Sequence, residues 1–170
     1  MPQNVKIRPE QPSDVEAISR ITELAFRSCP YGNHTEQFII EELRRTGALS
    51  ISLVAEVNTQ VVGHIAFSPV EISDGSKNWY ALGPVSVTPT YQGQGIGRAI
   101  IDAGLDALRA LGAEGCVLVG EPALYARFGF RNCRNLTFDD VPQKYIQCLN
   151  LGKHSARGKV MHHPAFSVKG

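Results

Sequence analysis

The amino-acid sequence predicts an α/β fold in which helices cover both faces of a mixed β-sheet. Apolar residues alternate with polar ones in several short segments, which is typical of half-buried strands, and recur at helical spacing in others. Residues 116–119 are apolar without alternation, which indicates a strand buried on both faces, as in the parallel part of a helix-covered sheet. The expected element order, β-α-α-β-β-β-α-β-α-β-β, fits one α/β sandwich.

Length, composition and charge are those of one globular domain. The chain has 170 residues, of which 43% are hydrophobic and 19% are charged. Because domains usually contain about 100–200 residues, we expect a single domain over residues 1–170. The 17 basic and 16 acidic residues leave a net charge of +1, which provides no strong field for nucleic acid or an anionic membrane. We expect neither as a partner, and the function has to be inferred from a site.

The cysteines and the N-terminal segment predict a reducing, cytoplasmic location. Cys29, Cys116, Cys133 and Cys148 form no CxxC pair and no dense framework of the kind that small secreted domains use. Residues 1–10 lack the apolar core of a signal peptide, and no apolar run approaches the ~20 residues that span a bilayer. We therefore expect four free thiols in a cytoplasmic protein.

The N-terminal part predicts a strand followed by two helices. Residues 5–9 alternate in polarity and end at a proline. Ser13 and Glu16 form an S-x-x-E capping box, which predicts the start of a helix that ends near Cys29. Helical spacing then predicts a second helix over residues 35–45.

The middle of the chain predicts a hairpin, a broken strand and a long helix. Residues 51–56 and 60–72 read as the two strands of the hairpin, and residues 80–87 as the next strand. Gly83-Pro84 interrupts that strand, which indicates a bulge or a splayed edge, because proline cannot donate to the ladder. Apolar residues at helical spacing then predict a helix over residues 95–111.

The C-terminal part is less regular. A short helix is expected to start at Pro122 and to carry Tyr125, and Phe130 opens another strand. Residues 145–151 and 159–168 are expected to form two further strands, with a loop between them.

Three glycines, Gly93, Gly95 and Gly97, lie between the broken strand and the long helix. Glycines at a helix N-terminus expose backbone N–H groups where the helix dipole is positive, so the segment could bind an anion, most often phosphate. It could equally be a plain strand-to-helix turn. A P-loop is excluded because no GK[ST] follows, and the G-x-G-x-G spacing does not match the G-x-G-x-x-G of dinucleotide-binding folds.

Two motifs in this order resemble the GNAT superfamily of acyl-CoA-dependent N-acetyltransferases. The first is Gln92-x-x-Gly95-x-Gly97 after Val85-Ser86-Val87-x-Pro89, and the second is Tyr125-x-x-x-Gly129-Phe130. The segment from Gly120 to Phe130 resembles a subgroup of uncharacterised bacterial members. The resemblance implies a mixed, centrally splayed sheet with helices on both faces and acetyl-CoA wedged in the opening. In this interpretation, Gly83-Pro84 is the splay.

By this resemblance, backbone amides of residues 93–98 would cradle the pyrophosphate of coenzyme A, and residues 85–87 would pair their backbone groups with the pantetheine arm. Arg98 could add a charge or be a solvated helix residue, and Val85 and Val87 could simply be core residues. The full set of expected cofactor contacts is Val85, Ser86, Val87, Gln92, Gly93, Gln94, Gly95, Ile96, Gly97, Arg98, Tyr125 and Phe128.

The resemblance implies transfer of an acetyl group from acetyl-CoA to a primary amine, with two catalytic groups. The Val87 N–H is the candidate to polarise the thioester carbonyl. Tyr125 is the candidate general acid, because a phenol of pKa ~10 can protonate a departing thiolate of pKa near 8.5. Alternatively, Tyr125 only packs on Phe128 and Phe130.

The general base is left open by the sequence. Residues 80–87 contain no carboxylate, although the family often places a Glu or an ordered water near the splayed strands. His64 could titrate near neutrality, or it could be a core or surface residue of its strand. Glu71 and Glu36 are weaker candidates.

Other residues limit the interpretation. Leu118 stands seven residues before Tyr125, where many family members carry an Asn that contacts the cofactor arm. Cys116 lies in an apolar run that would raise its pKa, which favours direct attack by the amine in a ternary complex over a covalent enzyme intermediate. His162 and His163 would point to opposite faces of a strand, so we expect no metal site.

The function and the partners have alternatives. A non-catalytic acyl-CoA-binding sensor or regulatory module would also explain the motifs. The acceptor, a small-molecule or peptide amine, would meet residues 31–34 and the region after Asn132. A free strand edge near the C-terminus is compatible with a homodimer.

Overall fold

The computed structural model describes residues 4–29 and 34–168, which form a large sheet and a small one. The large sheet has seven strands in the order β1-β2-β3-β5-β6-β9-β7. All neighbours in it are antiparallel except β5 and β6. The small sheet has the order β4-β10-β8. The strands are β1 (Val5–Pro9), β2 (Ile51–Val57), β3 (Gln60–Pro69), β4 (Glu71–Ile72), β5 (Trp79–Val87), β6 (Gly115–Val119), β7 (Arg131–Asn132), β8 (Leu136–Thr137), β9 (Ile146–Asn150) and β10 (Gly158–Met161).

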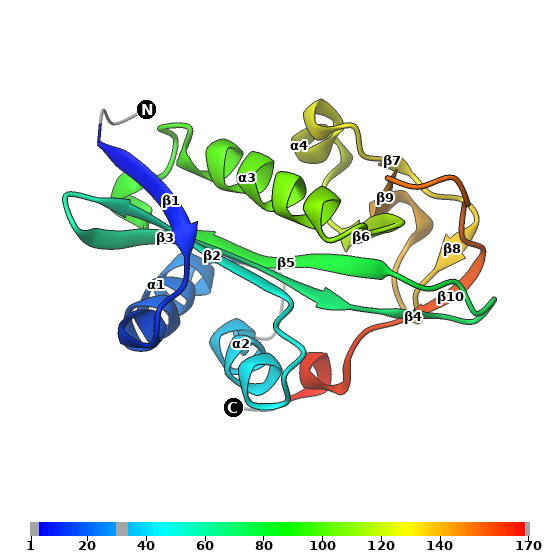
Figure 1. The fold of residues 1–170 in the computed structure, drawn as a ribbon, viewed down its shortest axis with the longest axis horizontal. Helices are drawn as coiled ribbons and strands as arrows, with labels where there is room; N and C mark the ends of the chain where they lie inside the picture. The colour runs from blue at the N-terminus through cyan, green and yellow to red at the C-terminus, as the bar shows by residue number, and fades with distance from the viewer. Residues whose placement is uncertain (1–3, 30–33, 169–170) are drawn as a thin grey trace.

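Helices cover both faces of the large sheet (Figure 1). Helices α1 (Val15–Phe26) and α2 (Glu36–Arg45) lie on one face, and α3 (Ile96–Ala110) lies on the other. A short helix, α4 (Pro122–Tyr125), follows β6. This arrangement confirms the predicted mixed sheet with helices on both sides.

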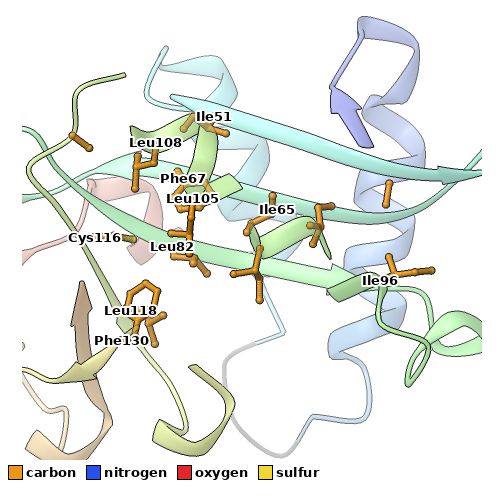
Figure 2. Close-up of a cluster of buried hydrophobic side chains, with 14 of the residues drawn as sticks. Ile51, Ile65, Phe67, Leu82, Ile96, Leu105, Leu108, Cys116, Leu118 and Phe130 are labelled. Atoms are coloured by element: carbon orange, nitrogen blue, oxygen red, sulfur yellow. The ribbon is translucent and has the colours of Figure 1, made fainter. Parts of the chain in front are cut away.

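The main core lies between α3 and the sheet (Figure 2). Ile100 and Leu108 of α3 are fully buried there, together with Ile65 and Phe67 of β3. A Cβ added at Gly104 would come within 2.5 Å of the Phe67 ring, so α3 packs closely on β3 because residue 104 has no side chain. This contact holds the middle of α3 against β3.

Strand β5 is interrupted at Gly83-Pro84, as the sequence predicted. Ile65 of β3 lies opposite Val85 and Phe67 lies opposite Leu82, so β5 carries one extra residue between these two pairs. On its other side, β5 pairs with β6 only over residues 79–81. Beyond the bulge, β5 and β6 are no longer paired, and the sheet is splayed at its centre.

Three predicted boundaries are wrong. The strand predicted over residues 60–72 ends at Pro69, and residues 71–72 form β4 in the small sheet. The N-terminal helix α1 starts at Val15 after a 3-10 turn over residues 12–14, and the Ser13–Glu16 capping box does not form. Instead, the Asp14 carboxylate accepts the backbone N–H of Gln11 at 2.6 Å. The predicted strand over residues 159–168 ends at Met161, because Pro164 starts a 3-10 turn over residues 164–167.

The prediction of four free thiols is also wrong. Cys133 and Cys148 form a disulfide with Cα atoms 5.5 Å apart, whereas Cys29 and Cys116 are free. Cys148 lies in β9 opposite Arg131 of β7, and Cys133 N–H donates to Ile146 O, so the two cysteines are diagonal neighbours across this strand pair.

Candidate functional site

The glycine segment forms an exposed loop that leads into α3. Gly93 and Gly95 adopt left-handed conformations, with φ of +77° and +87°, and residues 92–95 are exposed. Gly95 is the N-cap of α3 and supplies no side-chain cap. Ala99 N–H donates to Gly95 O at 3.1 Å, so the N–H groups of residues 96–98 precede the first helical hydrogen bond. The loop therefore presents unpaired donors at the positive end of the helix dipole.

Two glutamines hold this loop in place. Gln92 Nε2 donates to the carbonyl of Val87 at 2.9 Å, and Gln94 Nε2 donates to the carbonyl of Thr90 at 3.3 Å. Both side chains therefore turn back toward the end of β5, which leaves the backbone of the loop exposed. Gly97 and Arg98 lie in the first turn of α3, Arg98 being exposed.

The edge of β5 beyond the bulge is open. Thr88 N–H donates to Val62 O of β3 at 2.8 Å, and Val87 lies opposite Gly63. In an antiparallel ladder the bonding direction alternates, so the backbone groups of Val85 and Val87 point away from β3. They face the opening between β5 and β6.

Side chains on this part of β5 alternate between the two faces. Val85 and Val87 pack against the core under α3. Ser86 is buried on the side of α1, and its Oγ lies 3.4 Å from Thr22 Oγ1. By the same alternation, the backbone groups of Ser86 point toward β3 and not toward the opening.

A cavity of about 310 Å³ lies where β5 breaks. Five elements contribute to its wall besides β5: the end of α1, the start of α2, the end of β6, α4 and the C-terminal turn. Figure 1 shows α2 and the C-terminal turn side by side on the face of the sheet opposite α3. The lining residues are Phe26, Glu36, Ile39, Leu82, Gly83, Pro84, Val85, Leu118, Val119, Tyr125, His162 and Phe166.

Tyr125 is half-buried at this cavity. Its ring packs edge-on against Phe130, with centroids 6.1 Å apart, and a Cβ on Gly120 would lie 2.8 Å from Tyr125 Cε2. Burial raises the pKa of Tyr125 above its ordinary value, which keeps the phenol protonated. The packing expected as an alternative to catalysis is thus present, and the residue also lines the cavity.

Glu36 and His162 are the polar side chains in the wall besides Tyr125. Glu36 Oε1 is buried and has no hydrogen-bond partner among the described residues. His162 stacks between Phe138 and Phe166, with ring centroids 4.7 Å and 4.2 Å away. Burial lowers the pKa of His162 to about 4, so its ring is uncharged at neutral pH.

His64 does not share this cavity. It is fully buried in β3, and its Nε2 lies 2.7 Å from Ser52 Oγ. Burial lowers the pKa of His64 to about 4. Of the candidate bases, Glu71 also lies elsewhere, in the wall of a different cavity with Trp79, whereas Glu36 lines the same cavity as Tyr125.

Comparison with known proteins decides the family. A model of the acetyltransferase (GNAT) family matches residues 18–130. The uncharacterized N-acetyltransferase YhbS of Escherichia coli (strain K12) is 38% identical over 125 residues, which are 73% of this chain and 72% of YhbS. The chain belongs to the GNAT family.

Two solved GNAT structures are similar over nearly the whole length. A GNAT family acetyltransferase from Brucella melitensis, in complex with acetyl-CoA, is 47% identical with a TM-score of 0.86, covering 97% of this chain and 99% of that one. YhbS from Escherichia coli, in complex with CoA, is 32% identical with a TM-score of 0.86, covering 100% of this chain and 96% of that one. Both neighbours hold the cofactor that the sequence motifs implied.

The GNAT motif residues of this chain fit such a cofactor. A Cβ on Gly93 would have no atom within 4 Å, so the loop opens outward and leaves room for a phosphate against its backbone. Phe128 is half-buried and packs against the core on the α3 side. Leu118, which stands where many members carry Asn, is buried and offers the opening an apolar side chain only.

Several site features escaped the sequence interpretation. His162 and Phe166 come from the end of the chain, and no local pattern connects them to residues near Tyr125. Of the expected acceptor surface, residues 31–33 lie outside the described residues, and His34 is exposed. Within residues 4–29 and 34–168, no group of three or more His, Cys, Asp or Glu side chains could hold a metal ion, and no helix is long and apolar enough to cross a membrane.

Proposed function

We propose that this protein transfers the acetyl group of acetyl-CoA to a primary amine by direct attack in a ternary complex. One observation carries the proposal: the open edge of β5, which begins at the glycine loop, ends at the cavity that Tyr125 lines. A cofactor arm along this edge and an amine in the cavity would meet at the same break in the sheet. The GNAT membership of the chain and the acetyl-CoA and CoA held by its neighbours support this arrangement.

The backbone of this chain would hold acetyl-CoA. The N–H groups of residues 96–98, with the exposed backbone of Gly93 and Gly95, suit the pyrophosphate. The outward backbone groups of Val85 and the N–H of Val87 suit the pantetheine arm, as in the addition of a strand to a sheet, whereas the Val87 carbonyl already accepts Gln92 Nε2. When bound, acetyl-CoA supplies the activated acetyl thioester.

Two groups of the chain would act on the reacting atoms. The Val87 N–H points into the opening and is a donor for a carbonyl oxygen that gains negative charge. The Tyr125 phenol, protonated because of its burial, is the donor for the departing sulfur. In the balanced reaction, the amine nitrogen forms a bond to the acetyl carbon and the carbon–sulfur bond breaks. The sulfur leaves as the thiol with the proton of Tyr125, and the proton that the nitrogen loses restores the phenol.

Direct attack is favoured over a covalent acetyl-enzyme. Cys116 is the free thiol nearest to the motifs, and it is fully buried in β6. Burial raises its pKa well above the ordinary value, so the thiolate needed for nucleophilic attack is not formed at neutral pH.

Calorimetric titration with acetyl-CoA, followed by a thiol-release assay across a panel of amines, tests the proposal. We expect binding of acetyl-CoA, no binding of NAD, and thiol release that depends on an amine. Binding without release from any amine would favour a sensor or regulatory module. Absence of binding would contradict the function of the glycine loop.

A further inference from the structure

The wall of the cavity beside Tyr125 is more apolar than polar. Its lining includes two aromatic side chains, Phe26 at the end of α1 and Phe166 in the C-terminal turn. Aliphatic side chains, including those of Ile39 and Leu118, form much of the remaining surface. At about 310 Å³ the cavity is at the small end of the range for ligand sites, which suits a molecule with an apolar body of modest size.

Glu36 provides the one carboxylate among the described residues of this wall. It opens α2, and its Oε1 is buried without a hydrogen-bond partner among the described residues. A buried carboxylate oxygen without a donor is costly, so a ligand that supplies an N–H donor and a positive charge would be favoured there.

Among the described residues of the lining, no positive charge balances Glu36. They include neither Lys nor Arg, and the ring of His162 is held uncharged by its burial between two phenylalanine rings. A ligand carboxylate would therefore enter the cavity unpaired, next to the like charge of Glu36, which is unfavourable. A second ammonium group would also have no carboxylate to meet in the wall.

We propose that the acceptor is a primary monoamine with an uncharged, apolar body, and that the carboxylate of Glu36 binds its ammonium group. This inference rests on the proposed acetyltransferase function and specifies the substrate class of the same site. Amino acids with a free carboxylate and polyamines are predicted to be poor acceptors. Glu36 lines the same cavity as Tyr125 and residues 82–85, so it would bind the ammonium on the side of the sheet where β5 breaks. The ammonium then loses one proton to solvent, and the neutral amine is the nucleophile.

Calorimetric titration of the CoA-saturated protein with four probes tests this inference. The probes are 2-phenylethylamine, 2-phenylethanol, phenylalanine and spermidine. Relative to 2-phenylethylamine, 2-phenylethanol lacks the ammonium group, phenylalanine adds a carboxylate, and spermidine replaces the apolar body by further ammonium groups. We expect 2-phenylethylamine to bind at least about tenfold more tightly than each of the others, since a charge-assisted hydrogen bond contributes about that factor. Equal or tighter binding of phenylalanine or spermidine would overturn the proposal, as would no binding of 2-phenylethylamine.

The variant Glu36→Gln removes the charge and keeps the shape, and Glu41→Gln is the matched control. Glu41 lies on the same helix but is exposed, outside the cavity. We expect Glu36→Gln to weaken binding of 2-phenylethylamine roughly 10- to 100-fold while leaving CoA affinity unchanged, and Glu41→Gln to change neither. Unchanged amine binding in Glu36→Gln contradicts the role of this residue. Acetyl-CoA binding and thiol release with any amine test the proposed acetyltransferase function, whereas the four probes and the Glu36 variant test the substrate class. The function and the substrate class can therefore fail independently.

Discussion

Replacing His64 by Gln is predicted to weaken the acid sensitivity of the fold. His64 is fully buried in β3 and belongs to a polar network under α1 and α2. Its Nε2 lies 2.7 Å from Ser52 Oγ, Ser52 donates to Glu10 at 2.5 Å, and Arg44 donates to Glu10 at 2.9 Å. Asp14 is the other charged group that acts on the ring. Because the His64 ring is fully buried, water could not solvate a positive charge on it.

The magnitude follows from the pKa. Burial is the largest cause that lowers the pKa of His64, from 6.5 to about 4; the positive charge of Arg44 adds to this, whereas the carboxylates of Glu10 and Asp14 oppose it. The unfolded chain therefore takes up this proton first as the pH falls. Stability is unaffected above pH 6.5 and is lost progressively between pH 6.5 and about 4. At 1.36 kcal/mol per pH unit, this single ring costs about 2 kcal/mol between pH 7 and pH 5, and about 3 kcal/mol over the whole window.

Chemical denaturation at pH 7 and pH 5 measures this effect. We expect the loss of unfolding free energy between the two pH values to be about 2 kcal/mol smaller in His64→Gln than in the unmodified protein. His154→Gln is the control, because His154 is exposed and its replacement should leave the loss unchanged. His162, whose pKa is also lowered by burial, is present in all three proteins and cancels in the comparison. An unchanged pH dependence in His64→Gln would refute the reasoning.

Three other predictions concern the cofactor, the chemistry and the disulfide. Gly95→Glu places a bulky anion in the proposed phosphate cradle, at a residue with φ of +87°. Calorimetry should find the affinity for acetyl-CoA reduced at least about 100-fold with the fold retained. A near-normal affinity would contradict phosphate binding by this loop. Tyr125→Phe should lower kcat about 100-fold with an unchanged Kd for acetyl-CoA, whereas an equal rate would make Tyr125 a packing residue only. Cys133 and Cys148 are 15 residues apart in sequence, so reduction of their disulfide should lower the unfolding free energy by about 3 kcal/mol. In a Cys133→Ser/Cys148→Ser variant, reductant should leave the unfolding free energy unchanged.

The sequence predicts most of the fold because the signals concerned are local. The helical spacing over residues 95–111 corresponds to α3. The apolar run at residues 116–119 lies within β6, where residues 116–118 are buried as predicted and Val119 is exposed. Gly83-Pro84 identified the break in β5 because proline cannot donate to a ladder, whichever strands surround it. Each of these patterns depends on residues within a few positions of one another.

The features that were missed depend on contacts between distant segments. Asp14 replaces Ser13 at the start of α1 because Arg8, from β1, binds its carboxylate at 2.7 Å and 3.0 Å. The disulfide forms because the pairing of β7 with β9 brings Cys133 to Cys148, which the spacing of the cysteines does not reveal. His162 and Glu36, more than a hundred positions apart in sequence, line one cavity only because the C-terminal turn packs against α2.

The single extra residue in β5 links the two halves of the proposed site. If β5 and β6 stayed paired beyond residues 79–81, the backbone groups of Val85 and Val87 would be used by the ladder and could not bind a ligand. The bulge ends that pairing while β3 keeps hold of β5 on its other side, so the open edge is rigid on one flank and free on the other. The same residues, 82–85, form one wall of the cavity that contains Glu36 and Tyr125. A continuous strand would remove both surfaces at once, whereas this break puts an edge for the cofactor and a cavity for the amine within reach of each other.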